Sequence, residues 1–180
     1  MKQRGKTVTL YLMDGTPTGK IKCSLAGWTG LAYKIPRSEL EQSNSIPELS
    51  NTSVYLLFGL DESSEKPTVY IGQASQRKNG IGTYTRLVEH KRNQTENYWS
   101  EAVVLTTSNN SFGPTEISYL ENRFYNIARE VKRFDVKNGN DPSPGNITEE
   151  KQSELEDFID YTKIIVGALG YRVFEPLIKT

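Results

Sequence analysis

The sequence predicts an α+β fold, with a small three-stranded antiparallel sheet flanked by helices and an N-terminal β-hairpin extension. The main observation is the order of hydrophobic patterns after residue 53, which runs strand, strand, helix, strand, helix, helix. A chain in this order buries its apolar faces by packing helices against one sheet. Its 180 residues, 36% hydrophobic and 24% charged, suit a soluble globular protein with a hydrophobic core.

The N-terminal segment predicts a hairpin followed by a short helix. Residues 7–13 alternate apolar side chains with threonine and tyrosine, as a half-buried strand does. Asp14-Gly15 is a turn signal, and residues 19–25 form the expected partner strand. A short helix is expected to begin at Ser38, which has the spacing of a capping box.

A polar, proline-containing stretch at residues 42–53 has the composition of a linker. It separates the hairpin from the longer series of strands and helices. We therefore predict two parts, a β-rich extension at residues 1–50 and a main domain at residues 51–180.

Three strands are expected in the main domain. Residues 53–59 and 68–73 are rich in β-branched and aromatic side chains, and the polar loop between them favours an antiparallel hairpin. The apolar run within residues 101–106 predicts the third strand.

The remaining segments predict three helices. Residues 83–92 form a short basic helix, and Pro114 opens a long helix that ends near Lys132. Thr148 caps the last helix and Gly170 ends it. Each long helix carries one apolar stripe, which we expect to pack on the sheet.

Charge is balanced over the whole chain but not locally. Lys and Arg together number 22, as do Asp and Glu, whereas a nucleic-acid-binding protein is usually strongly basic. Between residues 76 and 92, however, basic side chains face only one acidic side chain, and such a patch can steer a phosphate backbone. The residues predicted to contact nucleic acid there are Arg77, Lys78, Lys91 and Arg92.

What the sequence lacks excludes several kinds of chemistry and location. One histidine and one cysteine leave no basis for a zinc site or a nucleophilic Cys–His pair, so catalysis must use carboxylates, tyrosines, arginines and a hard cation. There is no signal-peptide core and no apolar run of the ~20 residues that cross a bilayer. Cys23 has no partner for an internal disulfide, so we expect a cytoplasmic protein without a membrane partner.

Glu121 is the most informative residue of the long helix. It lies four residues after Ile117 and three before Phe124, at the edge of the apolar stripe. A carboxylate in such a place needs a partner because burying an unpaired charge is costly. The partner is either a metal ion or an internal salt bridge, with Arg123 or Arg86 as candidates.

Four further residues have both a functional and a structural interpretation. Arg86 and His90 are four residues apart on one helix face, where they either address a phosphate together or form a solvated basic surface. Tyr55 and Tyr70 lie in neighbouring predicted strands, where tyrosine is common for packing reasons alone.

The order of these residues resembles that of the GIY-YIG nuclease family. The resemblance covers residues 53–138, with similarity continuing to Pro176, and the Tyr-Ile-Gly motif is literal. The first motif departs, because Ser-Val-Tyr stands where Gly-Ile-Tyr is typical; its tyrosine is kept. The matching residues are Tyr55, Tyr70, Ile71, Gly72, Arg86, His90 and Glu121.

The resemblance implies an endonuclease that hydrolyses phosphodiester bonds in DNA with one Mg²⁺ or Mn²⁺ ion. Glu121 is then the metal ligand, and water and phosphate oxygens complete the coordination shell. Tyr70 is the general base toward the attacking water, although an ordinary phenol has a pKa near ~10 and needs help. Arg86 offsets charge on the phosphate, for which its planar fork is suited.

The resemblance also implies supporting roles. Tyr55 and His90 orient the water or the scissile phosphate, and Gly72 lets its strand pass close to the pocket. An asparagine follows the metal ligand in this family; Asn138 fits best in position and Asn140 is the alternative.

Two other interpretations stay open. The first is a catalytically silent domain that binds nucleic acid or protein on the same scaffold, which the balanced net charge favours. The second is a domain of a larger enzyme, in which a further domain or partner protein supplies specificity. The form of the DNA, the choice of DNA over RNA and the pathway are not fixed by the sequence, although Tyr84, Tyr98 and Trp99 could either stack on unpaired bases or fill the core.

Overall fold

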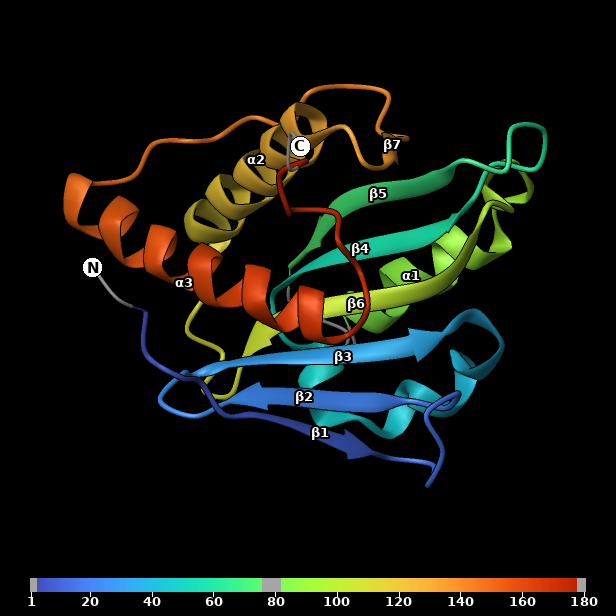
Figure 1. Ribbon diagram of the computed structural model, residues 1–180, viewed down its shortest axis with the longest axis horizontal. Coiled ribbons are helices and arrows are strands. Elements are labelled where there is room, and N and C mark those ends of the chain that lie inside the picture. The colour runs from blue at the N-terminus through green and yellow to red at the C-terminus, as the bar shows by residue number, and fades with distance from the viewer. Residues whose placement is uncertain (1–2, 76–81, 178–180) are drawn as a thin grey trace.

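A computed structural model describes residues 3–75 and 82–177. The strands are β1 Val8–Leu12, β2 Ile21–Leu25, β3 Gly30–Pro36, β4 Ser53–Leu60, β5 Pro67–Ala74, β6 Trp99–Thr107 and β7 Asp135–Val136. The helices are α1 Gly82–Arg92, α2 Pro114–Val131 and α3 Glu149–Ala168. In this part of the chain the seven strands form one sheet in the order β1-β2-β3-β6-β4-β5-β7. Helices α2 and α3 cover one face of the sheet, and α1 lies behind the other (Figure 1).

The prediction of a small three-stranded antiparallel sheet is wrong, although the α+β class is correct. Strands β4, β5 and β6 do pair antiparallel, with β4 in the middle. Strand β3 continues the sheet beyond β6 and joins it to the predicted hairpin of β1 and β2. At the other end β7 runs parallel to β5, so the sheet has seven strands and is mixed.

Both strands that the sequence did not predict depend on pairing with distant segments. β3 is buried on both faces for most of its length, so its apolar residues do not alternate with polar ones. It pairs with β6 from Gly30 opposite Thr107 to Pro36 opposite Glu101. β7 has only two residues, too few for a periodic pattern.

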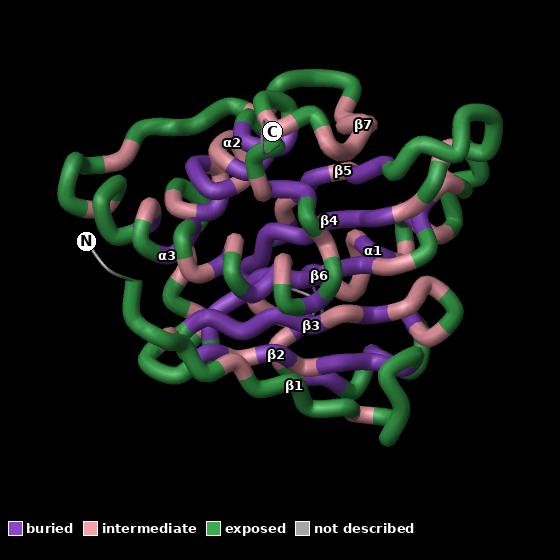
Figure 2. Tube along the Cα trace, viewed as in Figure 1, coloured by how far each residue is buried: buried purple, intermediate pink, exposed green. Residues whose placement is uncertain are grey.

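The sheet separates two hydrophobic cores, and the central strands are buried on both faces (Figure 2). Side chains alternate between the faces along a strand. On β4, Val54 and Leu56 therefore pack toward α2 and α3, whereas Tyr55 and Leu57 pack toward α1. This alternation places Tyr55 in the second core, under α1.

The stretch predicted to be a linker is folded. It contains most of the short 3₁₀ turn η2 Glu41–Ser45 and all of η3 Pro47–Ser50. A further 3₁₀ turn, η1 Arg37–Glu39, stands in place of the helix expected at Ser38. Leu49 within the stretch, and Leu40 just before it, are fully buried in the core beneath α1. The chain before β4 therefore packs against the same core as the candidate site.

The start of α3 provides a test of helix capping. The Thr148 side-chain oxygen accepts a hydrogen bond from the Lys151 amide at 3.2 Å. Thr148→Ala removes this acceptor and is expected to lower the free energy of unfolding by about 1 kcal/mol. Thr148→Ser keeps it and should stay within about 0.5 kcal/mol of the unaltered protein. Urea unfolding followed by circular dichroism measures both, and equal losses would rule out the capping bond as the cause.

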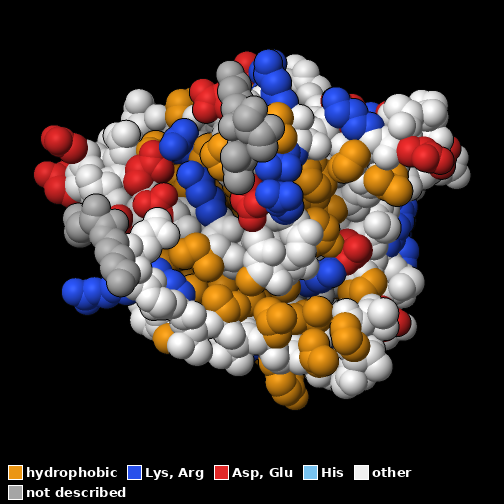
Figure 3. All heavy atoms as spheres, in the orientation of Figure 1, with side chains coloured by type: hydrophobic (Ala, Val, Ile, Leu, Met, Phe, Trp, Pro, Cys, Tyr) orange, Lys and Arg blue, Asp and Glu red, His pale blue; other side chains and the backbone are white. Residues whose placement is uncertain are grey.

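Acidic and basic side chains are interspersed on the face covered by α2 and α3 (Figure 3). The ion pairs there include Arg123–Glu156 and Lys151–Glu154. This mixture accords with the balanced charge of the whole chain. Among the helices of the described ranges, none has both the length and the apolar character required to cross a bilayer.

Candidate active site

Two adjacent strands provide the first part of the candidate site. In the β4–β5 ladder, Tyr55 lies opposite Gly72, and Leu57 lies opposite Tyr70. Residues directly opposite in an antiparallel pair point to the same face, so both tyrosines and Gly72 face α1. A Cβ atom at Gly72 would lie 2.4 Å from the hydroxyl oxygen of Tyr55. The absence of a side chain at Gly72 therefore makes room for the Tyr55 ring.

Three rings meet where α1 crosses these strands. The Tyr55 and Tyr70 ring centroids are 6.4 Å apart, and the His90 ring lies 5.4 Å from the first and 5.0 Å from the second. Tyr55 is 0% exposed and His90 is 5% exposed, whereas Tyr70 is partly exposed. His90 is thus buried against residues of the second core and does not lie on a solvated helix face.

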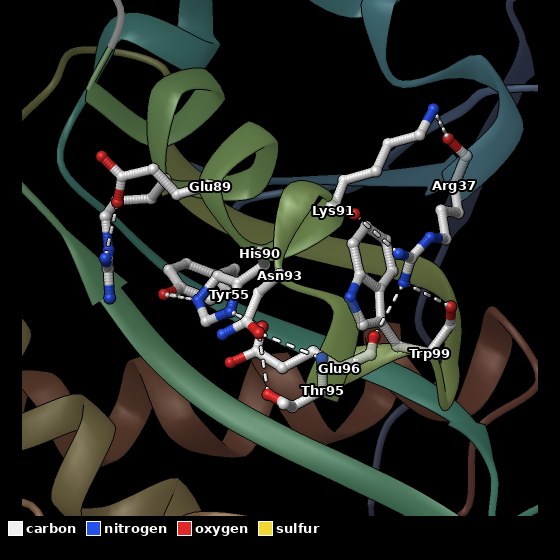
Figure 4. Close-up of polar contacts among 10 residues, drawn as sticks. Arg37, Tyr55, Glu89, His90, Lys91, Asn93, Thr95, Glu96 and Trp99 are labelled. Carbon is white, nitrogen blue, oxygen red and sulfur yellow. Dashed lines mark hydrogen bonds and ion pairs between the residues drawn. The ribbon is translucent and has the colours of Figure 1, made fainter.

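A chain of hydrogen bonds runs through His90 (Figure 4). The Tyr55 hydroxyl and His90 Nε2 are 2.8 Å apart, and His90 Nδ1 and Glu96 Oε2 are 2.5 Å apart. Glu96 belongs to the 3₁₀ turn η4, Gln94–Glu96, which directly follows α1. The three side chains form a continuous polar path through an apolar region.

Burial raises the pKa of both phenols. For Tyr55 burial is the main cause, and the positive charge of Arg86 opposes it. The pKa of Tyr70 is likewise raised by burial, again with Arg86 acting in the opposite direction. Arg86 is therefore the group nearby that favours a phenolate at either tyrosine.

Arg86 lies on α1, one turn before His90. Its Nη1 donates to the Glu89 carboxylate at 2.7 Å, a pair formed by residues three apart on the helix. Both side chains keep substantial solvent exposure, 35% for Arg86 and 44% for Glu89. A surface pair of this kind is weak, so the guanidinium can exchange its partner for a phosphate.

Glu121 reaches the site from α2, on the other face of the sheet. Gln73 Nε2 donates to Glu121 Oε2 at 2.5 Å and lies 3.5 Å from the Ser118 hydroxyl. Burial raises the pKa of Glu121, while the Gln73 hydrogen bond and the charge of Arg86 act against the increase. The predicted alternative partner Arg123 instead pairs with Glu156.

The candidate site wraps around the end of β5. Neighbouring residues of a strand point to opposite faces, so Gly72 faces α1 and Gln73 faces α2. Beyond Val69 the described residues include no strand paired with the outer side of β5. Groups from both faces, Tyr70 on one and Glu121 on the other, can therefore act at the same strand end.

Asn138 supports this strand end and lies apart from the rings. Its Oδ1 accepts from the Ile71 amide at 3.0 Å, and its Nδ2 donates to the Ile71 carbonyl at 2.6 Å. The side chain thus makes the two backbone hydrogen bonds to Ile71, between Tyr70 and Gly72, that a neighbouring strand would otherwise make. The alternative Asn140 is exposed and has no contact of this kind among those described.

The residues predicted to contact nucleic acid are not all visible. Arg77 and Lys78 lie outside the described residues. Lys91 forms an ion pair with Glu41 at 2.9 Å, and Arg92 is exposed on the same end of α1. Their predicted role stays a prediction.

The three nearby aromatic residues contribute to the second core. Trp99 is 1% exposed and belongs to that core, while Tyr84 and Tyr98 are partly buried at its edge. The packing interpretation therefore holds for Trp99.

Sequence reasoning missed two residues that contact the predicted ones, Gln73 and Glu96. Gln73 follows the Tyr-Ile-Gly motif directly, so its position next to the motif was the available signal. Glu96 lies six residues after His90 in a polar loop, where periodicity gives no indication of its direction.

The residues fit one hard cation bound mainly by water and substrate. Within the described ranges, no group of three or more His, Cys, Asp and Glu side chains is arranged to hold a metal ion. Mg²⁺ commonly takes only one or two carboxylates together with water and phosphate oxygens. Glu121 is a half-buried carboxylate with a fixed orientation, and it suits that mode of binding.

Comparisons with protein-family models, with curated proteins and with solved structures found no match to this chain.

Proposed function

We propose that the protein is a GIY-YIG-type endonuclease that hydrolyses phosphodiester bonds in DNA with one divalent metal ion. One observation carries the proposal: two tyrosines, a histidine and an arginine gather on one face of the sheet, and a glutamate on the other face is hydrogen-bonded to Gln73 of the same strand end. These residues come from β4, β5, α1 and α2. Close packing alone does not require a carboxylate and a guanidinium beside one buried and one half-buried phenol.

Tyr70 is the general base in this proposal. It is the partly exposed member of the ring cluster, and so the tyrosine that water can approach more readily than the buried Tyr55. Arg86 opposes the effect of burial on the pKa of Tyr70 and so favours transfer of the water proton to it. The same guanidinium offsets the negative charge that develops on the phosphate.

Glu121 holds Mg²⁺ or Mn²⁺, and Gln73 fixes the direction of its carboxylate. When bound, such an ion polarises the phosphate oxygens and stabilises the charge of the transition state. Tyr55 and His90 stay buried and orient the groups around Tyr70. Asn138 keeps the Tyr70–Gly72 backbone in place through Ile71.

A cleavage assay tests the proposal. Supercoiled plasmid, a branched duplex and single strands are incubated with Mg²⁺ or Mn²⁺ beside an EDTA control. Tyr70→Phe is expected to lower the rate ~10²–10⁴-fold, the usual contribution of a general base. Glu121→Ala is expected to lower it ~10³-fold or more, because several kcal/mol of charge stabilisation depend on the metal.

The outcomes separate the proposal from its alternatives. Metal-dependent cutting that both variants lose supports the nuclease and both roles. Cutting that persists in both variants rejects the assigned site. A folded protein that shifts DNA in a gel without cutting it would favour the silent binding domain.

Gln73 provides a more specific test of the metal ligand. Gln73→Leu removes the donor that orients Glu121, so the Mg²⁺ concentration for half-maximal cleavage should rise roughly 10–100-fold. Saturating Mg²⁺ should restore most of the rate. Gln42→Leu, at an exposed position of η2 with no contact to Glu121 among those described, is the matched control and should leave the Mg²⁺ dependence unchanged.

A further inference from the structure

We propose that Glu96 is a positioning residue that fixes the tautomer of His90, and that Arg37 of the N-terminal segment holds the turn carrying Glu96. The tautomer itself is a property of the free protein; only its value for cleavage rests on the proposed function.

The contacts of His90 define the direction of its hydrogen bonds. A carboxylate only accepts hydrogen bonds, so the ring nitrogen beside Glu96 must carry the proton. In a neutral imidazole the other nitrogen, Nε2, is then an acceptor. The Tyr55 hydroxyl is its partner at 2.8 Å and must be the donor. The path therefore runs from Tyr55 through His90 to Glu96, with every proton directed one way.

This direction matters for the neighbouring arginine. When the Tyr55 proton points to His90, the lone pairs of the phenol oxygen are free to face the positive charge of Arg86. With the opposite tautomer, His90 would donate to Tyr55, and the phenol proton would turn toward the guanidinium, which has donors only. By fixing the tautomer of His90, Glu96 therefore keeps the Tyr55 oxygen, and not its proton, directed toward the Arg86 guanidinium.

The turn that carries Glu96 is held from within and from outside. Inside it, the Asn93 side chain accepts from the Thr95 amide at 3.1 Å and from the Thr95 hydroxyl at 2.7 Å. From outside, Arg37 Nη1 donates to the Glu96 carbonyl at 2.9 Å. The turn is thus tied to η1, which belongs to the chain segment before β4.

The guanidinium of Arg37 is itself held in position by several contacts (Figure 4). Its guanidinium lies 4.4 Å from the ring centroid of the buried Trp99, within cation–π range. It also donates to the carbonyls of Lys91 at 2.9 Å and Trp99 at 3.2 Å. One side chain therefore joins the end of α1, the turn η4 and the start of β6. Lysine has no planar fork and cannot make these three contacts together.

The experiment uses the fact that His90 is the only histidine of the chain. With ¹⁵N-histidine labelling, the NMR shifts and couplings of the two ring nitrogens report its tautomer without further assignment. Spectra are recorded on the full chain without DNA or metal, at a pH about two units above the ordinary imidazole value of about 6.5. We expect the proton on Nδ1 in the unaltered protein.

Variants test whether Glu96 and Arg37 determine the tautomer of His90. In Glu96→Ala the Nδ1-bound fraction should fall and the Nε2-bound form should dominate. Glu96→Gln keeps the size, but its amide can donate or accept, so a mixture is expected. Glu41→Ala removes another carboxylate next to α1, one that pairs with Lys91, and should leave the His90 spectrum unchanged. In Arg37→Lys the Nδ1-bound fraction should fall, and the amides of residues 94–96 should exchange faster with solvent.

Each result decides the proposal. A proton on Nε2, or on both nitrogens, in the unaltered protein overturns it. A tautomer that stays the same in both Glu96 variants overturns the role of Glu96, and unchanged spectra and exchange in Arg37→Lys overturn the role of Arg37. Circular dichroism confirms that each variant is folded before it is compared.

Cleavage kinetics add the functional readout. Glu96→Gln should lower kcat about tenfold or more with little change in KM, because the site is misoriented but substrate contacts are kept. A protein with the expected tautomer that cuts no DNA would reject the proposed function and leave the positioning intact. A protein that cleaves DNA but carries the His90 proton on Nε2 would reject the positioning role of Glu96 and leave the proposed function intact.

Discussion

Glu121→Gln is expected to abolish metal-dependent cleavage while making the folded protein more stable at neutral pH. The loss of activity should be ~10³-fold or greater, because an amide is a poor ligand for a hard cation and the carboxylate is the protein ligand we assign. Few substitutions at a half-buried position stabilise a protein, so the combination is diagnostic.

The sign of the stability change follows from the pKa. Burial raises the pKa of Glu121 in the folded state, so folding favours its protonated form. As the pH rises above the ordinary carboxyl value of about 4.3, ionisation of Glu121 costs the folded state more than the unfolded state. Glutamine removes this cost and is neutral at every pH. The advantage of the variant should therefore be absent near pH 3 and grow as the pH rises through the folded pKa.

Thermal unfolding from pH 3 to pH 8, without added metal, measures this difference. At pH 8 the increase in Tm should not exceed about 2–4 °C, which corresponds to ~1 kcal/mol for a chain of this size. Glu130→Gln, at an exposed position on the same helix, should change neither Tm nor cleavage. A Tm that falls at neutral pH in Glu121→Gln would mean that the ionised carboxylate stabilises the fold and is not held there at a cost.

Gly72→Ala is expected to damage both the fold and the site. The added methyl group would lie 2.4 Å from both Cζ and the hydroxyl oxygen of Tyr55, a side chain that is fully buried and whose hydroxyl is hydrogen-bonded to His90. Overpacking at such a position costs about 1–3 kcal/mol, or about 2–12 °C in Tm. Because Tyr55 must move away from His90, cleavage should fall ~10²-fold even at temperatures where the variant is folded.

Gly139→Ala is the matched control for that substitution. A Cβ atom at Gly139 would meet no atom within 4 Å, so neither stability nor cleavage should change appreciably. Thermal unfolding and cleavage at 20 °C are measured for both variants. A fully active Gly72→Ala protein would mean that the Tyr55 ring can be displaced without consequence, which contradicts its assigned role.

Local patterns were sufficient to predict the elements that contain the candidate site. Strands β4 and β5 follow from their richness in β-branched and aromatic residues, and the long helices follow from their apolar stripes and caps. The size of the sheet was not predictable in this way. β3 is recognisable only through its pairing with β6, and β7 only through its pairing with β5.

The candidate site likewise contains some residues that lie close together in sequence and others that only the folded chain brings there. Tyr70, Gly72, Arg86 and His90 lie close together in sequence, and the family resemblance is what implied a common site for them. Glu96 has its role only because a polar turn folds back under α1, and Arg37 because a segment far earlier in the chain reaches that turn. Neither residue lies on an amphipathic face that a periodic pattern could reveal.

The pairing of β3 with β6 limits how this protein can be used as a part in engineered fusions. A shortened version that starts at residue 51 would leave one edge of β6 without its partner strand, and it would also lose the Arg37 contacts to Glu96 and Trp99. Exposed strand edges recruit other chains, so such a fragment should aggregate. A DNA-recognition module should therefore be attached to the intact chain and should not replace its first 50 residues.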